Sequence, residues 1–244
     1  MKTELSKIIE NKNIARDVFR MVLSTSIAKD VMCGQFVQVE VPNYFLRRPI
    51  SVSEVVDENT LVIVYKVVGD GTKVLSQLKE NEEVSLFGPC GTGFPLNDED
   101  VVLVGGGVGV PPLLETAKQY LSNNHKVTVV LGFNTKDDMI LKEAFEALGC
   151  EVHIATMDGS IGTKGTVIDA IRENNLDVNF VLACGPLPML KAIQNTYSHG
   201  YISLESRMAC GMGACMGCVV KDTEDNALRV CKDGPVFEIG KVVL

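Results

Sequence analysis

The sequence lacks an apolar segment long enough to cross a membrane as a helix, which requires about 20 consecutive apolar residues. The best candidate, residues 101–114, is interrupted by four glycines and two prolines. Residues 1–20 mix acidic, basic and amide side chains and hold no apolar core of a signal peptide. These absences predict a cytoplasmic protein that makes no membrane contact.

An excess of basic residues is also missing, since 23 Lys and Arg stand against 31 Asp and Glu and give a net charge of −8. Binding to a nucleic-acid backbone depends on Lys and Arg, so we expect no nucleic-acid partner. The three histidines, His125, His153 and His199, show neither a metal-ligand spacing nor a serine partner. We therefore interpret them as surface or structural residues.

Cysteine, by contrast, is present at eight positions. A disulfide framework is not expected, because nothing marks the chain as secreted. Four cysteines are scattered, at positions 33, 90, 150 and 184, whereas the other four fall between Cys210 and Cys231. This asymmetry indicates a bound cofactor rather than disulfides.

The first third of the chain carries short runs of β type, of which residues 36–41, 61–68 and 83–87 are the clearest. Short strands at this spacing are typical of a small antiparallel barrel or sandwich. From residue 101 the pattern changes to alternating strands (101–104, 127–131, 151–155, 180–183) and helices (111–122, 136–148, 166–173, 188–197). Such alternation predicts a parallel sheet with helices on its faces.

These patterns predict a β plus α/β fold in three parts. Residues 1–95 form an antiparallel β-barrel domain, residues 96–202 a Rossmann-like parallel α/β domain, and residues 203–244 a small C-terminal subdomain. The last part is rich in glycine and cysteine and offers little that would pack as a helix. We expect its structure to depend on what it binds.

The strongest motif is the cysteine cluster, in which Cys210, Cys215 and Cys218 follow a C-x4-C-x2-C spacing and Cys231 comes after twelve further residues. Three thiolates on one loop and a fourth further along are typical of a [2Fe–2S] cluster. The glycines between them free backbone N–H groups to turn toward the sulfurs. A four-cysteine zinc site is the alternative, but it usually has two separated short knuckles.

Two weaker motifs in the barrel half suit a flavin nucleotide. Residues 46–51 (LRRPIS) are taken to close a strand, with an arginine fork for a pyrophosphate and a serine hydroxyl for a ring nitrogen. Gly69-Asp70-Gly71-Thr72 precedes a helix expected over residues 73–79, with Thr72 as its N-cap, which is an anion site. A solvated arginine pair beside a turn is the alternative for the first motif.

The glycine loop at residues 105–113 (GGGVGVPPL) lies between a strand and a helix, as a pyrophosphate site requires. Val110 occupies the third glycine position of the standard fingerprint, and a simple packing turn is the alternative. Cys184-Gly185-Pro186 follows another apolar strand, so we expect it at the ligand crevice, unless Cys184 is only a buried structural residue. No arginine occupies residues 132–135, which favours NAD(H) over NADP(H).

In chain order, these motifs resemble the ferredoxin–NADP reductase superfamily over the whole length. Within it, the chain is similar to the electron transfer subunits of NAD-dependent dihydroorotate dehydrogenase B, most clearly at residues 203–210 (SLESRMAC) and 230–237 (VCKDGPVF). Two differences from broader relatives are visible. Ile50 stands where the flavin motif commonly has an aromatic, and the gap before Cys231 is much shorter than in plant-type ferredoxins.

The resemblance implies three cofactors and their sites. FAD is expected at Arg48, Pro49, Ile50, Ser51, Tyr65, Lys66, Val67, Gly71 and Thr72. NAD(H) is expected at Gly105, Gly106, Gly107, Gly109, Cys184, Gly185 and Pro186, with Cys184 as the catalytic residue of the crevice. One [2Fe–2S] cluster is expected on Cys210, Cys215, Cys218 and Cys231.

The resemblance also implies a separate FMN-containing catalytic subunit, in a heterotetramer of two plus two. Dihydroorotate is oxidised on the partner's FMN, and electrons cross the cluster singly to FAD, which reduces NAD⁺ by hydride transfer. The chain itself shows no recognisable orotate site. The rivals are the flavin subunit of an NAD(P)H:ferredoxin-type oxidoreductase and a zinc-stabilised nucleotide-binding module without catalytic activity.

Overall fold

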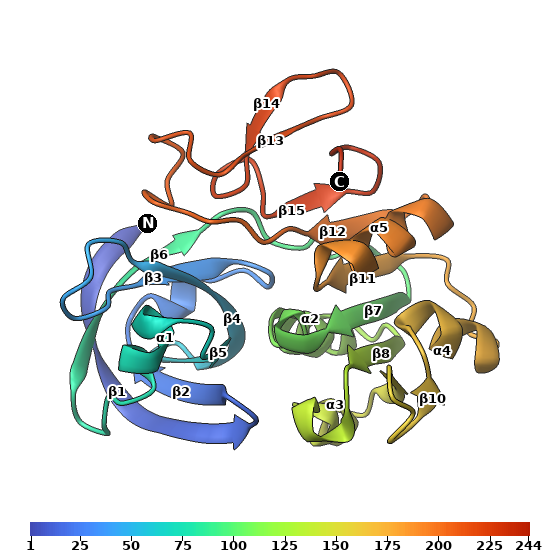
Figure 1. Ribbon diagram of the computed structural model, residues 1–244, viewed down its shortest axis with the longest axis horizontal. Coiled ribbons are helices and arrows are strands. Elements are labelled where there is room, and N and C mark those ends of the chain that lie inside the picture. The colour runs from blue at the N-terminus through green and yellow to red at the C-terminus, as the bar shows by residue number, and fades with distance from the viewer.

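Six strands of the N-terminal region close into an antiparallel barrel in the order β1–β2–β5–β4–β3–β6 (Figure 1). The computed structural model describes all 244 residues. Closure pairs every strand edge, which settles the choice between a barrel and a sandwich. Inward-facing side chains such as Leu61 and Ile63 fill the interior completely. The strands are β1 (Lys2–Ala15), β2 (Val18–Ser24), β3 (Phe36–Val39), β4 (Arg48–Asp57), β5 (Thr60–Lys66) and β6 (Glu83–Cys90), with a short 3-10 turn η1 (Ala28–Asp30).

Two local expectations in the barrel half are wrong. The segment with the paired arginines opens strand β4 at Arg48 and does not close a strand. The short helix α1 (Asp70–Leu75) begins earlier than expected, with Gly69 as its N-cap. Thr72 is therefore the third helical residue, and its hydroxyl accepts hydrogen bonds from the N–H groups of Val68 and Gly69 at 3.0 and 3.3 Å. Gly69 has an extended backbone and no side chain to cap the helix, and Thr72 instead bonds back to the N–H groups before it.

The second region is a seven-stranded sheet in the order β10–β9–β8–β7–β11–β12–β15. Its strands run parallel except β15, which pairs antiparallel with β12. Helices α2 and α3 pack on one face, and α4 and α5 on the other. The strands are β7 (Val101–Gly106), β8 (Val127–Phe133), β9 (Glu151–Thr156), β10 (Thr163–Lys164), β11 (Val181–Cys184), β12 (Gly200–Ser203) and β15 (Val236–Glu238). The helices are α2 (Pro112–Ser122), α3 (Lys142–Ala147), α4 (Val167–Glu173), α5 (Leu187–Thr196) and the 3-10 turn η2 (Gly107–Gly109).

The helix expected over residues 136–148 is instead broken into two pieces. A 3-10 turn, η3 (Lys136–Asp138), is separated from α3 by three residues. Leu141 before α3 has a left-handed backbone with φ of 62°, which a continuous right-handed helix cannot contain. The apolar pattern of residues 136–148 would suit one helix. The left-handed residue instead turns the chain between η3 and α3.

At β7 the chain changes the side on which it adds strands to the sheet, and this change locates the ligand crevice. From β7 the chain proceeds through β8 and β9 to one side, and then returns to place β11 on the other side of β7. Cys184 at the end of β11 lies beside Gly105 near the end of β7. Ligands of open α/β sheets bind outside the carboxyl ends of the strands at such a switch point. The glycine loop and residues 184–186 therefore meet at the expected crevice.

The C-terminal region lies across the top of both halves in Figure 1 and contains no helix. It forms a hairpin of β13 (Val219–Lys221) and β14 (Ala227–Arg229) before β15 joins the sheet. On the barrel side, the N–H of Thr92 donates to the carbonyl of Gly234 at 2.6 Å. Cys218, Cys231 and the barrel residue Phe36 share one apolar cluster with α4 and α5. The cysteine region is thus packed against both halves.

The two larger halves are also fastened together by helix α2. Glu115, only 5 % exposed, accepts a hydrogen bond from the N–H of Val55 at 2.9 Å, and Lys118 donates to the Val55 carbonyl at 2.6 Å. Val55 lies beyond residues 48–51, the part of β4 that pairs with β3, so no strand covers this edge of β4 at Val55. Because Val62 and Val64 of the barrel also belong to the apolar cluster of α2, the relative position of the two halves is fixed by packing.

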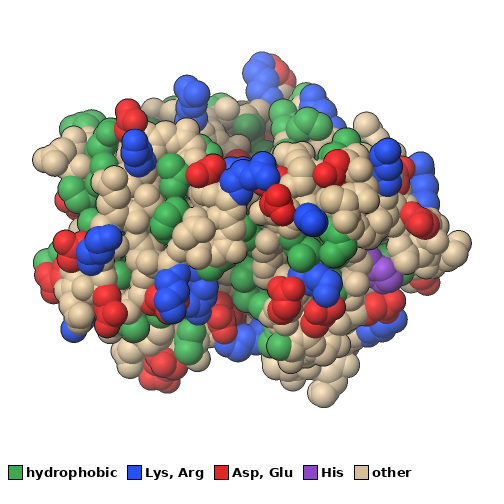
Figure 2. Space-filling view, turned by 60° about the horizontal axis from the view of Figure 1, so that its bottom comes forward, with side chains coloured by type: hydrophobic (Ala, Val, Ile, Leu, Met, Phe, Trp, Pro, Cys, Tyr) green, Lys and Arg blue, Asp and Glu red, His purple; other side chains and the backbone are tan.

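The surface carries no uniform charge on the face shown in Figure 2, where acidic and basic side chains are interspersed. Among the helices, none is both long and apolar enough to cross a membrane.

Candidate functional site

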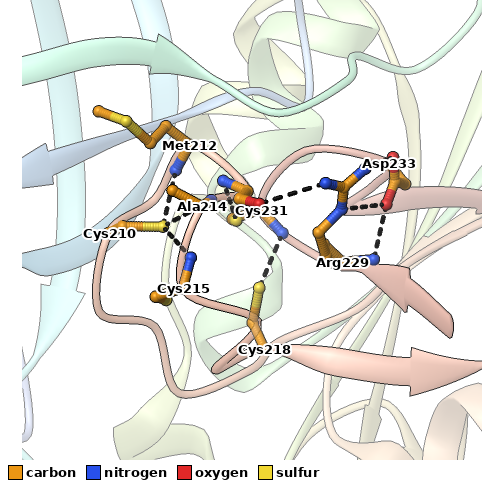
Figure 3. Close-up of polar contacts among 9 residues, drawn as sticks. Cys210, Met212, Ala214, Cys215, Cys218, Arg229, Cys231 and Asp233 are labelled. Atoms are coloured by element: carbon orange, nitrogen blue, oxygen red, sulfur yellow. Dashed lines mark hydrogen bonds and ion pairs between the residues drawn. The ribbon is translucent and has the colours of Figure 1, made fainter.

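The loop between Cys210 and Cys218 turns its backbone N–H groups toward sulfur (Figure 3). The N–H groups of Met212, Ala214 and Cys215 lie 3.5, 3.3 and 3.4 Å from the Sγ of Cys210. Further along, the N–H of Gly213 lies 3.1 Å from the Sγ of Cys231 and that of Cys231 lies 3.4 Å from the Sγ of Cys218. Such donors stabilise negative charge on the sulfurs, as an iron–sulfur cluster requires.

The backbone links the cysteines to one another. The N–H of Cys215 points to the Sγ of Cys210, and the N–H of Cys231 points to the Sγ of Cys218. A tetrahedral zinc site needs four ligands around one ion, whereas the four thiolates of a [2Fe–2S] cluster are shared between two irons. The N–H donors to sulfur suit the thiolates of such a cluster.

The electrostatic surroundings of Cys210 differ from those of Cys231. Although burial raises the pKa of the Cys210 thiol, the N–H donors of Met212, Cys215 and Ala214 outweigh it and lower the pKa to about 6. Burial, reinforced by the neighbouring Cys218, raises the pKa of Cys231 to about 12. The thiolate form of Cys210 is thus favoured by the loop itself, whereas Cys231 needs a positive metal to become charged.

An arginine–aspartate pair that the sequence analysis missed ties the two cysteine segments together. Arg229 donates to the carboxylate of Asp233 through Nε and Nη2 at 2.9 and 3.1 Å. Its Nη1 donates to the carbonyl of Gly213 at 3.2 Å. The hydrogen bond from Arg229 holds the pKa of Asp233 below its usual range. The only sequence signal was the spacing of opposite charges four residues apart on either side of Cys231.

A cavity of about 780 Å³ opens at the end of the barrel and contains most of the expected flavin residues. Its walls come from the barrel, from the ends of β11 and β12, and from residues 203–208, which lead directly to Cys210. This size suits a cofactor. The expected residues that line it are Arg48, Pro49, Ile50, Ser51, Tyr65, Lys66 and Thr72.

The two weak flavin motifs are adjacent in space. A Cβ added at Gly71 would lie 2.3 Å from Nη2 of Arg48, so the guanidinium lies directly against the glycine. The guanidinium also stacks 5.2 Å from the ring centre of Tyr44 and donates to the carbonyl of Leu46. The proximity of these residues gives the combined motif a specificity that neither had alone.

Two expected flavin residues do not line this cavity, namely Val67 and Gly71. Tyr65 reaches it only from the barrel core, where its hydroxyl donates to Asn11 at 3.0 Å. The cavity has three aromatic wall residues that were not expected there, namely Phe36, Tyr44 and the fully exposed Phe45. Tyr44 and Phe45 stand just before the arginine pair, separated from it by Leu46, and that position was their only signal.

A second cavity, of about 430 Å³, lies beside the first at the crevice of the sheet. Gly106, Gly107 and Pro186 line it, and Lys66 and Val108 line both cavities. Cys184 lines the first cavity and not the second. The two cavities are therefore neighbours, and the end of β11 lies between them.

The other expected nucleotide residues, Gly105, Gly109 and Gly185, do not line this second cavity but allow close packing behind it. A Cβ on Gly109 would lie 2.3 Å from the carbonyl oxygen of Cys184, a distance that no side chain tolerates. The glycine loop thus presses against residues 184–185, and the packing interpretation holds for part of the motif. Cys184 itself is buried, and burial raises the pKa of its thiol to about 12.

Asp138 is a further wall residue of the nucleotide cavity that the sequence analysis missed. Its carboxylate accepts a hydrogen bond from the hydroxyl of Thr135 at 3.1 Å. It belongs to η3, the turn that breaks the expected helix after strand β8. The misjudged helix is the reason why this side chain was not expected at the crevice.

Two family models match the chain over regions that agree with this geometry. Residues 103–195 match the oxidoreductase NAD-binding domain. Residues 205–243 match the iron–sulfur cluster binding domain of dihydroorotate dehydrogenase B. Together with the barrel, these matches define the class: an NAD-linked reductase of two domains with an iron–sulfur segment at its end.

Similar proteins identify the particular family. The chain is 44 % identical to the dihydroorotate dehydrogenase B (NAD(+)) electron transfer subunit of Fusobacterium nucleatum, covering 97 % of each chain. It is 42 % identical to the subunit of the same name from Lysinibacillus sphaericus, covering 100 % of both. The chain belongs to the family of dihydroorotate dehydrogenase B electron transfer subunits. The resemblance inferred from the sequence motifs is confirmed.

Solved structures agree on the fold. A chain of the NADH-dependent reduced ferredoxin-NADP oxidoreductase, described for flavin-based electron bifurcation, superposes with a TM-score of 0.90 at 32 % identity, covering 98 % of this chain and 90 % of that one. Phthalate dioxygenase reductase superposes with a TM-score of 0.69 at 19 % identity over 98 % of this chain and 94 % of its own, which shows the fold alone. The predicted fold class and the oxidoreductase assignment are confirmed.

Proposed function

We propose that this chain is the electron transfer subunit of an NAD-dependent dihydroorotate dehydrogenase of pyrimidine biosynthesis. It passes electrons from an FMN-containing catalytic subunit through a [2Fe–2S] cluster and FAD to NAD⁺. One observation carries the order of the cofactors. The flavin cavity shares Lys66 and Val108 with the nucleotide cavity and is walled on another side by the segment that leads to Cys210. The flavin site therefore lies between the other two.

The flavin supplies the exchange between two-electron hydride transfer and one-electron transfer. The chain's residues hold it in place. Arg48 presents a guanidinium suited to the pyrophosphate, and Ser51 offers a hydroxyl to the ring edge. Tyr44 and Phe45 supply aromatic surface that Ile50 cannot. FAD thus occupies the larger cavity.

The nucleotide site uses Gly106, Gly107 and Pro186 as direct walls, with the remaining glycines behind them. Cys184 lines the flavin cavity close to the nucleotide cavity, where it would border the rings that exchange the hydride. Because burial raises the pKa of its thiol to about 12, it stays protonated and cannot act as a thiolate nucleophile. Its role is to shape the crevice so that nicotinamide and flavin rings meet.

The cluster ligands are Cys210, Cys215, Cys218 and Cys231. Their spacing and the backbone N–H donors to their sulfurs support this assignment. A separate catalytic subunit follows from the family, and we propose that it carries FMN and forms a heterotetramer of two plus two with this chain. The enzyme works in the cytoplasm, where reducing conditions keep thiols free.

The order of the cofactors can be tested by rapid mixing of NADH with the anaerobic Cys218→Ser variant. We expect near-normal flavin bleaching, because hydride transfer needs only the two neighbouring cavities, but no transfer to the partner's FMN. Cys150→Ser is the matched control, since Cys150 is buried away from the loop, and it should preserve both steps. Collapse of flavin reduction in Cys218→Ser, with FAD and fold retained, would refute the proposed order.

The rival function is the flavin subunit of an NAD(P)H:ferredoxin-type oxidoreductase, which the 32 % identical structure favours. The higher identity to dihydroorotate dehydrogenase subunits outweighs it. Co-purified with its neighbouring subunit, the complex should reduce NAD⁺ with dihydroorotate. If it instead reduced only ferredoxin, the rival would be correct. Stoichiometric zinc without iron or flavin would support the non-catalytic module.

A further inference from the structure

Gln38 is a completely buried glutamine with no hydrogen-bond partner for its side chain. It is 0 % exposed, and both Nε2 and Oε1 lack partners. Strand β3 explains the position, since Val37 and Val39 point into the barrel core. Gln38, between them, therefore faces outward from the barrel. Burying an amide without hydrogen bonds is costly, so in folded proteins such a group almost always has a partner.

The covering element is the cysteine loop. A Cβ built on Gly211 would lie 2.5 Å from Nε2 of Gln38, 2.7 Å from Cγ and 3.0 Å from Cδ. Gly211 directly follows Cys210 and has a left-handed φ of 69°, which brings its backbone flat against the amide. The flavin cavity includes Arg47 to Ser51, but Gln38 is not among its walls. The amide therefore faces the cluster loop and not the flavin.

We propose that the Gln38 carboxamide donates a hydrogen bond through Nε2 to the [2Fe–2S] cluster from the barrel side. This inference rests on the ligand set proposed above. The sulfurs of a cluster are acceptors, and the cysteine loop supplies only backbone donors on its own side. Gln38 adds a side-chain donor from the flavin domain. It is a positioning residue that tunes the cluster's potential, and it leaves the four ligands unchanged.

A donor to the cluster stabilises the reduced, more negative state more than the oxidised state. In Gln38→Leu we therefore expect the equilibrium between reduced cluster and reduced FAD to shift about tenfold against the cluster, a fall of about 59 mV for one electron. Gln38→Glu keeps the shape, and because a carboxyl buried beside a negative cluster stays protonated and can still donate, its potential should stay close to that of wild type. Both are measured by redox titration followed by electron paramagnetic resonance.

The proposed hydrogen bond can also be detected directly, by magnetic resonance. In protein labelled with ¹⁵N in glutamine side chains, pulsed electron paramagnetic resonance of the reduced cluster should show a nitrogen coupling that disappears in Gln38→Leu. Gln35→Leu is the matched control, because the Gln35 amide already bonds the N–H of Met32 at 2.9 Å and the carbonyl of Gly91 at 2.7 Å. That variant should lose stability, while its potential stays unchanged.

The outcomes separate this inference from the proposed function. If wild-type protein holds no [2Fe–2S] cluster, the ligand assignment is wrong. If the cluster is present but Gln38→Leu leaves the potential and the nitrogen coupling unchanged, buried water satisfies the amide and only this inference is wrong. An equal shift in Gln35→Leu would show that packing, and not the donor, sets the potential, and would also overturn the proposal.

Discussion

The crevice of the parallel sheet and the C-terminal cysteine loop are built to bind cofactors by opposite means. The crevice is formed by fully buried strands, such as those of Val104 and Ala183, and by backbone packed too closely for any side chain at Gly109. The loop instead leaves Cys215 exposed, and it is held by N–H···S contacts and one ion pair. Packing shapes the first site before its ligand arrives, whereas binding completes the second.

The largest effect expected from this comparison is in Cys215→Ser. The loop has little apolar packing of its own around this residue, so losing one ligand removes the cluster and the order of the loop together. We expect complete loss of the reduced-cluster signal in electron paramagnetic resonance and faster hydrogen exchange over residues 205–233. Exchange in helix α2 should remain slow, because its apolar residues pack in the other core cluster, which contains none of the four ligand cysteines.

Two scattered cysteines provide the control for that variant. Burial raises the pKa of Cys33 and of Cys150 to about 11, so both are neutral thiols inside apolar cores. Cys33→Ser and Cys150→Ser should leave the cluster signal intact. A normal signal in Cys215→Ser, or its loss in both controls, would contradict the ligand set.

Gly109→Ala should damage the crevice and spare the loop. The new methyl group would lie 2.3 Å from the carbonyl oxygen of Cys184, so β11 or the glycine loop must move. A misplacement of about 1 Å can cost 10²-fold in rate, so we expect NADH-driven flavin reduction to fall at least tenfold. Stopped-flow absorbance measures this, and the cluster signal should stay normal.

Gly149→Ala tests whether the effect of Gly109→Ala comes from its clash with Cys184 or from general destabilisation. Gly149 has a φ of 93° but no atom within 4 Å of a built Cβ, and it lies after α3 away from the crevice. Its substitution should lower the melting temperature by a few degrees and leave flavin reduction unchanged. If Gly149→Ala slows flavin reduction as much as Gly109→Ala, general destabilisation explains both.

The sequence predicted the parts of the molecule whose chemistry is local. The cysteine spacing identified the cluster loop, and the alternation of strands and helices identified the sheet and its crevice. Helix boundaries near glycine were less predictable, because Gly69 caps α1 with extended backbone and a left-handed Leu141 breaks the helix expected over residues 136–148. Neither conformation follows from hydrophobic pattern.

The sequence could not predict the contacts between segments that lie far apart along the chain. Asp138 reaches the nucleotide cavity only because that helix is broken. Gln38 reaches the cysteine loop only because the barrel, the sheet and the C-terminal region pack around a shared cluster. Residue identity alone gave no sign of either position.

The ion pair that closes the cysteine loop should give a moderate effect. Arg229 holds the pKa of Asp233 below its usual value of 3.8. Stability from this pair is therefore fully present above that value and is lost as pH falls through the lowered folded pKa. Asp233→Asn should lose cluster to a chelator several-fold faster than wild type, by a ratio that stays constant between about pH 5 and pH 8.

Asp225→Asn is the control for the ion pair. Lys221 and Asp225 also form a pair four residues apart, but their side chains are 64 % and 78 % exposed. Pairs that exposed contribute little, so this variant should lose its cluster at the wild-type rate. A ratio for Asp233→Asn that changes strongly between pH 5 and pH 8 would show that another group controls cluster retention.

The last effect, on cofactor choice, concerns one side chain of the crevice. Asp138 lines the nucleotide cavity after strand β8, and a carboxylate there opposes the 2′-phosphate of NADPH by like-charge repulsion. In Asp138→Asn we expect kcat/KM for NADPH to rise about tenfold, while that for NADH changes less than threefold. Steady-state assays with an artificial acceptor measure both values. Asp137→Asn is the matched control, because Asp137, like Asp138, pairs with Arg16 but is 62 % exposed and does not line the cavity. An equal gain in Asp137→Asn would mean that net charge near the crevice, and not the position of Asp138, sets the preference. The cluster spectrum should be identical in both variants, because the crevice and the loop are shaped by separate interactions.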